Sequence, residues 1–183
     1  MTKTLNISLF ILMALVTVSK CSAQLYQMND GEIYFLSDAK LEKIEARSKK
    51  LKGLMDVTTN QFAFSIETNT FIGFNSDLQR EHFEESYLET HIYPKATFSG
   101  KLIDKFNPAL DKQTTRAKGN LEIHGVKKER IIEVVITKSG AGYVISSSFF
   151  VLLEDHGIAI PRVVFQKIAP TVEVSVSGLL LKK

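Results

Sequence analysis

Apolar and polar residues alternate along several stretches of this chain, the pattern of strands that bury one face. The clearest stretch is residues 116–124, where one face carries Ala117, Gly119, Leu121 and Ile123. Similar patches cover residues 61–66, 96–102, 131–136, 143–153 and 171–181. Glycine-containing turns separate several of them. The pattern predicts an all-β fold, either a sandwich or a closed barrel, and closure is attractive because it removes unpaired sheet edges.

One stretch, near residues 76–88, predicts a short helix. Ser76 and Gln79 have the spacing of a capping box, in which the serine side chain accepts from the amide of Gln79 and the glutamine side chain reaches back to the amide of Ser76. Leu78, Phe83 and then Tyr87 or Leu88 follow at near-helical spacing, with charged residues between them.

Residues 38–52 fit neither pattern cleanly. Leu41, Ile44 and Leu51 are closer to a helical period than to alternation, and the basic side chains between them would suit an amphipathic helix on a membrane surface. Ser48, however, stands where such a helix needs an apolar residue. The pattern alone leaves this segment open between helix and strand.

The first 23 residues have the layout of a secretory signal peptide. Lys3 supplies positive charge, residues 5–18 are mostly apolar, and small residues end the segment at Ala23. A membrane span needs about 20 apolar residues, more than this run provides. Lys20 disfavours a lipid anchor on Cys21, because that position calls for a small residue. We therefore expect cleavage after Ala23, a periplasmic or secreted product, and no stable membrane insertion.

Composition adds three limits. The formal net charge is +3, from 23 basic and 20 acidic residues, too small a surplus to indicate a nucleic acid partner. Cys21 is the only cysteine, so the exported protein would have no disulfide bond. No linker or repeat divides residues 24–183, which predicts a single domain.

Residues that could catalyse a reaction or bind a metal do not form a recognisable site. His82 and Glu85 are three residues apart on the predicted helix, but no HExxH motif accompanies them. His124 and His156 each precede a glycine in a predicted turn, and the serines at 146–148 lack a nucleophile-elbow motif. The sequence therefore predicts a protein that is not an enzyme, with no catalytic residues, metal or cofactor.

Phenylalanine occurs twelve times and is spread over most of the predicted elements. A barrel of about eight strands either fills with side chains or encloses one small ligand. Small residues beside large ones, such as Gly100 near Phe98, would leave volume inside. This pattern permits a cavity without requiring one.

Three stretches together resemble the YceI family. Residues 78–100 combine the helix-like segment with Tyr93-Pro94 and the strand KATFSG, and residues 118–126 read KGNLEIHGV, similar to the family's Gly-x-Leu-x-Ile-His-Gly-Val turn. Residues 149–161 resemble the late loop that closes the domain. The match covers about residues 31–181.

The resemblance implies an extended, lipocalin-like antiparallel β-barrel with a long apolar cavity. It also implies a secreted bacterial protein that binds a polyisoprenoid, an isoprenoid quinone or a similar long-chain lipid, with a homodimer as one option. Residues 41–55 would then be two strands, broken near residues 48–50, with the basic side chains outward. The alternative function is an interaction module with a filled core, whose basic segment 47–52 binds an acidic partner or a membrane surface.

Alternation assigns the walls of the expected cavity to the apolar faces of the strands. The candidate ligand-binding residues are Phe62, Phe64, Phe98, Leu121, Ile123, Val134, Ile136, Ile145, Val172, Val174 and Val176.

Overall fold

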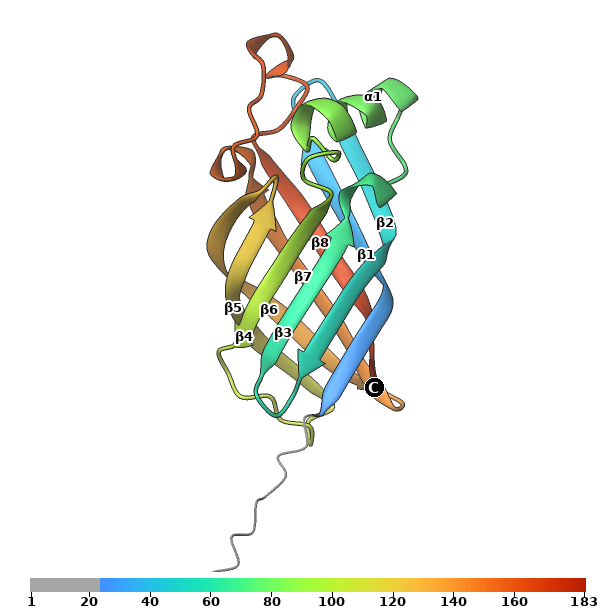
Figure 1. The fold of residues 1–183 in the computed structure, drawn as a ribbon, viewed down its shortest axis with the longest axis vertical. Helices are drawn as coiled ribbons and strands as arrows, with labels where there is room; N and C mark the ends of the chain where they lie inside the picture. The colour runs from blue at the N-terminus through green and yellow to red at the C-terminus, as the bar shows by residue number, and fades with distance from the viewer. Residues whose placement is uncertain (1–23) are drawn as a thin grey trace, which may run out of the picture.

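Every strand pairs antiparallel with its neighbours in the sequence, and the last strand pairs with the first, so the sheet closes into a barrel of eight strands (Figure 1). The structure is a computed structural model and describes residues 24–183. The strands are β1 (Leu25–Asp38), β2 (Lys43–Asp56), β3 (Gln61–Glu67), β4 (Lys95–Leu102), β5 (Lys112–Ile123), β6 (Val126–Ser139), β7 (Gly142–Leu152) and β8 (Thr171–Lys182). The predicted all-β antiparallel barrel is confirmed. The predicted signal peptide, residues 1–23, lies outside the described residues.

The two ends of the barrel differ. The upper end in Figure 1 carries the long connections between β3 and β4 and between β7 and β8. These contain the short helical elements η1 (Thr68–Thr70), α1 (Asp77–Glu81), η2 (His82–Tyr87), η3 (Leu153–His156) and η4 (Arg162–Val164). The turns between β1 and β2 and between β5 and β6 lie at the same end, while the lower end carries the other three loops and the C-terminus.

The helix predicted near residues 76–88 is present, as α1 followed directly by a wider π-helical turn, η2. Ser76 caps it as expected, since its Oγ accepts from the amide of Gln79 at 3.1 Å. The returning contact differs: Oε1 of Gln79 accepts from the amide of Asn75 at 3.0 Å rather than from that of Ser76. The Gln79 side chain therefore accepts from the amide one residue before the one that a standard capping box uses.

Residues 41–55 do not form two strands, as the family resemblance implied, because β2 is continuous from Lys43 to Asp56. Ala46 and Ser48 point inward, Lys49 and Lys50 both lie exposed, and Leu51 resumes the inward face. The register with β1 shifts at the same place, which identifies a β-bulge. The basic side chains of β2 do point outward.

Ser48 is buried in this bulge with its polar group satisfied. Its hydroxyl lies 2.7 Å from that of Thr70 and accepts from the amide of Lys50 at 3.2 Å. A serine in an otherwise apolar face thus ties the bulged strand to the connection after β3.

The lower end is closed by aromatic and other large side chains. Tyr143 contacts Tyr26 and Phe106 with ring centroids 5.1 and 5.0 Å apart, and Met28 and Leu180 are fully buried nearby in β1 and β8. Phe106 belongs to the loop between β4 and β5, and it is only 6% exposed.

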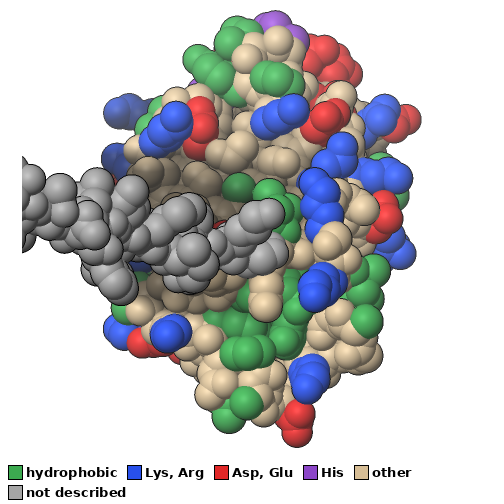
Figure 2. Space-filling view, turned by 60° about the horizontal axis from the view of Figure 1, so that its bottom comes forward, with side chains coloured by type: hydrophobic (Ala, Val, Ile, Leu, Met, Phe, Trp, Pro, Cys, Tyr) green, Lys and Arg blue, Asp and Glu red, His purple; other side chains and the backbone are tan. Residues whose placement is uncertain are grey.

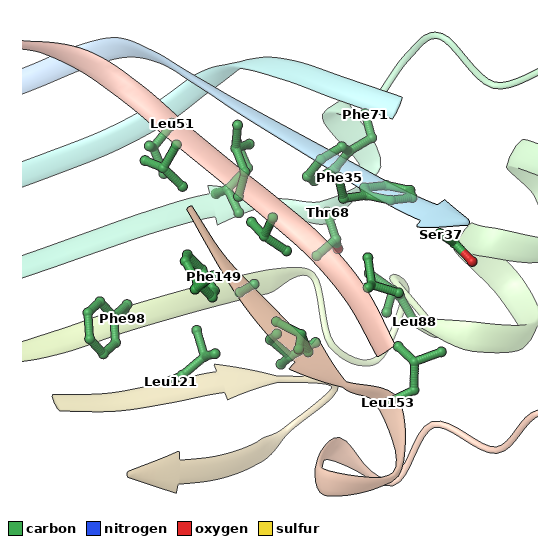
Figure 3. Close-up of a pocket in the computed structure, with 18 of the residues that line it drawn as sticks. Phe35, Ser37, Leu51, Thr68, Phe71, Leu88, Phe98, Leu121, Phe149 and Leu153 are labelled. Atoms are coloured by element: carbon green, nitrogen blue, oxygen red, sulfur yellow. The ribbon is translucent and has the colours of Figure 1, made fainter. Parts of the chain in front are cut away.

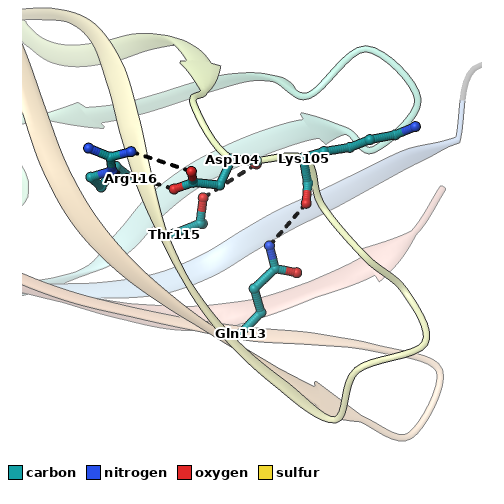
Figure 4. A network of polar contacts seen from close by, with 5 residues as sticks. All are labelled: Asp104, Lys105, Gln113, Thr115 and Arg116. Atoms are coloured by element: carbon teal, nitrogen blue, oxygen red, sulfur yellow. Dashed lines mark hydrogen bonds and ion pairs between the residues drawn. The ribbon is translucent and has the colours of Figure 1, made fainter.

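Polar contacts at the base of β5 hold the loop that carries Phe106 (Figure 4). Arg116 pairs with Asp104 at 3.4 Å, and the Thr115 hydroxyl donates to the Asp104 carbonyl. Gln113 donates to the Lys105 carbonyl at 3.2 Å. The arginine bond also lowers the pKa of the Asp104 carboxyl.

We expect Phe106→Ala to lower the free energy of unfolding by about 3 kcal/mol, because it removes a buried ring and leaves a cavity. Leu110→Ala is the matched control: Leu110 lies in the same loop but is 47% exposed, and its loss should change stability by less than about 0.5 kcal/mol. Urea unfolding followed by circular dichroism measures both. Equal effects would mean that Phe106 does not close the lower end.

Candidate functional site

The barrel encloses a cavity of about 460 Å³. All eight strands contribute side chains to its wall, and nearly all of these are apolar (Figure 3). It extends from near the lower ends of the strands, where Met55 and Leu102 line it, to the upper end, where α1, η2 and the connection between β7 and β8 contribute further residues. Small-molecule sites in proteins are commonly apolar pockets of about 300–1,000 Å³.

All eleven residues assigned to the wall from alternation do line this cavity. They lie on β3 to β8, and their apolar neighbours on the same faces line it too. The opposite faces point outward: Lys118, for example, is exposed and pairs with Glu129 at 3.2 Å, while Leu121 is 6% exposed.

The wall also includes residues that alternation did not find. β1 and β2 contribute, among others, Ile33, Phe35, Leu51 and Met55. Neither strand shows clean alternation, because the bulge shifts the register between them.

A cluster of four phenylalanines holds the helical segment over the upper end. Phe83 of η2 stacks on Phe35 of β1 with centroids 5.4 Å apart and an angle of 13° between the rings. Phe71 and Phe74 contact Phe83 at 5.7 and 5.0 Å. Because Phe35 and Phe83 also line the cavity, this cluster forms part of its upper wall.

Two hydroxyl groups of the cavity wall near the upper end are already hydrogen-bonded. Ser37 Oγ accepts from the amide of Ala169 at 2.9 Å, and Thr68 Oγ1 donates to the carbonyl of Pro94 at 3.0 Å. Because of these bonds, the hydroxyls of Ser37 and Thr68 are not left in the interior as unpaired polar groups.

Charged groups of the wall lie at its upper end, which we call the mouth. Gln79 of α1 donates through Nε2 to Glu42 at 2.9 Å, and Lys167 lies 4.0 Å from the same carboxylate. His82, on η2, also reaches the cavity from this end. The wall is therefore apolar below and polar at the mouth, which suits a molecule with a long apolar part and a polar end.

His124, in one of the two predicted turns, forms hydrogen bonds to other loops. Nε2 of His124 lies 2.6 Å from a carboxylate oxygen of Glu89, and Nδ1 lies 3.2 Å from the carbonyl of His156. Glu89 and His124 adopt left-handed backbone conformations, with φ of 44° and 51°. Next to them, a β-carbon on Gly125 would lie 2.5 Å from the ring of Tyr93, so only glycine fits. These contacts connect three loops of the upper end.

His156 is fully buried rather than at a rim. Its Nδ1 lies 3.0 Å from the carbonyl of Val126, and since a carbonyl only accepts, Nδ1 carries the proton. Burial lowers the pKa of His156 below its usual 6.5, although the bond to Val126 opposes the shift.

No group of three histidine, cysteine or acidic residues suited to a metal ion occurs within residues 24–183. His82 is exposed on η2, and the serines at 146–148 belong to β7.

Residues 26–179 match the family model for the YceI-like domain. The chain belongs to the YceI family. This confirms the resemblance found in the sequence, over nearly the same residues. Within residues 24–183, no helix of this YceI-family protein is both long and apolar enough to cross a membrane.

Solved structures share the fold of this YceI-family protein at low sequence identity. A polyisoprenoid binding domain from Saccharophagus degradans is 14% identical, with a TM-score of 0.72 over 88% of this chain and 100% of its own. BcnA of Burkholderia cenocepacia is 15% identical, with a TM-score of 0.67 over 83% of this chain and 96% of its own. The YceI protein of Campylobacter jejuni is 14% identical, with a TM-score of 0.57 over 74% and 82%. No curated protein sequence matches.

We expect the buried His156 to make stability depend on pH. Its pKa is lower in the folded than in the unfolded chain, so its contribution is complete above about pH 6.5 and is lost as pH falls through the folded-state pKa. His156→Asn keeps a donor for the Val126 carbonyl but does not titrate. Urea unfolding from about pH 7.5 to 5 should therefore show a steeper loss for the wild type than for the variant. If the stability of the wild type and of the variant fell equally with pH, His156 would not be the source of the pH dependence.

Proposed function

We propose that this protein binds and carries a long-chain amphiphile, such as a polyisoprenoid or an isoprenoid quinone, in its barrel cavity, in the periplasm or after secretion. It needs no cofactor and catalyses no reaction. The observation that carries the proposal is the apolar cavity, whose charged groups are confined to the mouth.

The physical basis is the transfer of hydrocarbon out of water. Burial stabilises by about 0.8 kcal/mol for each CH₂ group, so a long tail binds well with few polar contacts. The walls around Phe98, Leu121 and Val174 offer such a surface. The name of the similar Saccharophagus degradans domain, which states that it binds polyisoprenoids, supports this class of ligand.

We place the tail in the barrel and the polar head at the mouth. Glu42 and Gln79 meet there at 2.9 Å, with Lys167 on the other side of the carboxylate. A hydroxyl or quinone oxygen arriving at this point could exchange hydrogen bonds with these groups. Lower in the barrel it would meet a wall that is almost entirely apolar, which disfavours the reverse orientation.

The alternative interaction module required a filled core. The cavity of about 460 Å³ does not fit that requirement. The basic side chains at 47–52 lie on the outer face of β2, interrupted by the buried Ser48 and Leu51. On the face drawn in Figure 2, basic side chains are interspersed with acidic ones and do not form a single dense patch.

Extraction of the purified protein with organic solvent, followed by mass spectrometry, tests the proposal directly. We expect a long-chain lipid in roughly equimolar amount. Absence of such lipid, together with failure of the delipidated protein to bind an added isoprenoid probe, would contradict a carrier function.

Variants of β5 test whether the cavity is the binding site. Leu121→Lys should abolish binding of a fluorescent isoprenoid probe, because an unpaired ammonium in the cavity costs several kcal/mol. Lys118→Ala, three residues away on the outer face, should bind as the wild type does, since its exposed ion pair contributes little.

Ala96→Phe provides a second variant of the wall that adds volume but no charge. Ala96 lines the cavity on β4 and is only partly buried, so a larger side chain should take space from the ligand. Circular dichroism must show each variant folded. Unchanged probe binding in folded Leu121→Lys and in Ala96→Phe would place the ligand elsewhere.

A further inference from the structure

Three large apolar side chains stand exposed beside the mouth. Val163 is 90% exposed, and Phe165 and Leu41 are each 63% exposed. We call these three residues the apolar rim. Val164, between the first two, points the other way and lines the cavity. One short segment thus presents one side chain to the cavity and two to the surroundings.

The apolar rim is attached firmly to the barrel. The amide of Leu41 donates to the carbonyl of Gln166 at 2.9 Å, which joins the turn after β1 to the connection between β7 and β8. The buried bond between Ala169 and Ser37 joins the same two parts. The rim therefore has a defined place at the upper end, where the connection extends beyond the strands (Figure 1).

Basic side chains outnumber acidic ones by three to two around the apolar rim. The connection from Gly157 to Pro170 contains Arg162 and Lys167 and no acidic residue. The turn after β1 adds the exposed Lys40. Glu42 is the acidic residue of this turn and the partner of Lys167 and Gln79, and Asp38 ends β1 just before it.

The helical side of the mouth has the opposite character. Asp77, Glu81, Glu84 and Glu85 lie there with one arginine, Arg80, which is paired to Asp77 at 3.7 Å. Basic side chains thus lie on one side of the mouth and acidic ones on the other, while exposed apolar side chains stand on both, since Leu78 of α1 is 59% exposed on the acidic side.

We propose that the apolar rim docks on a lipid bilayer that contains anionic lipid, with the mouth facing the membrane. This proposal rests on the proposed carrier function and names the surface from which the ligand is taken or to which it is delivered. Aromatic and aliphatic side chains flanked by basic ones suit the interface of an anionic membrane, where Phe165 and Val163 leave water and Arg162 meets the headgroups. A tail that passes between cavity and bilayer at this point avoids water.

Flotation with vesicles of equal parts phosphatidylcholine and phosphatidylglycerol tests the docking. We expect the wild-type protein to float with the vesicles, and the double variant Val163→Ser/Phe165→Ser to bind about tenfold or more weakly, because two apolar contacts are lost. Arg162→Glu should weaken binding to these vesicles but not to vesicles of phosphatidylcholine alone. The matched control is Ile131→Ser, because Ile131 is 59% exposed but lies on the outer wall of β6.

A double variant that floats as well as the wild type, or a control that is lost equally, would overturn the proposal. So would a wild-type dimer in size-exclusion chromatography that the double variant converts to a monomer, since a second copy would then cover the rim.

Binding of a soluble fluorescent fatty acid, without vesicles, separates this proposal from the carrier function. Neither Val163 nor Phe165 lines the cavity, so the double variant should bind this probe as the wild type does. Failure of the wild type to bind the probe would count against the carrier function, whereas loss of flotation alone counts against the docking.

Discussion

Closure of the sheet is the constraint on which the rest of the structure depends. Because β8 pairs with β1, the inward side chains of eight strands share one interior, and each described strand has a paired neighbour on both sides. Such an interior stays partly empty only if its residues are placed suitably. Here Phe64 packs over Gly53 on the neighbouring strand, where a β-carbon would lie 2.3 Å from its ring. This arrangement keeps the ring close to the wall and leaves the centre of the barrel open.

The distribution of aromatic side chains along the barrel explains where the open volume lies. One cluster, with Phe35 and Phe83 at its centre, covers part of the upper end, and another, around Tyr143, closes the lower end. Rings therefore hold the ends together, and between them aliphatic side chains share the wall with Phe62, Phe64 and Phe98. The packing of these rings therefore both stabilises the fold and shapes the cavity.

The sequence predicted the strands that alternate and missed the features that depend on distant contacts. Residues 116–124 gave the correct inward face because β5 is regular throughout. The bulge at Lys49 and Lys50 moved the inward positions of β2 by one residue, and the resulting spacing imitates a helix. β1 was not predicted, since its burial does not alternate. The mouth could not be predicted either, because Glu42, Gln79 and Lys167 lie far apart in the sequence and meet only after the barrel closes.

The aromatic cluster around Tyr143 closes the lower end of the barrel, beneath the residues that line the cavity. Under the proposed carrier function, a chain that enters at the mouth would stop at the residues above the Tyr143 cluster, so the depth of the cavity would set the length of hydrocarbon that is fully shielded. Shorter chains leave part of the interior empty, and longer ones keep their last carbons in contact with the surroundings. Under the same proposal, a change in the loop between β4 and β5 that displaced Phe106 from the Tyr143 cluster, far from the mouth, would alter which chain lengths fit.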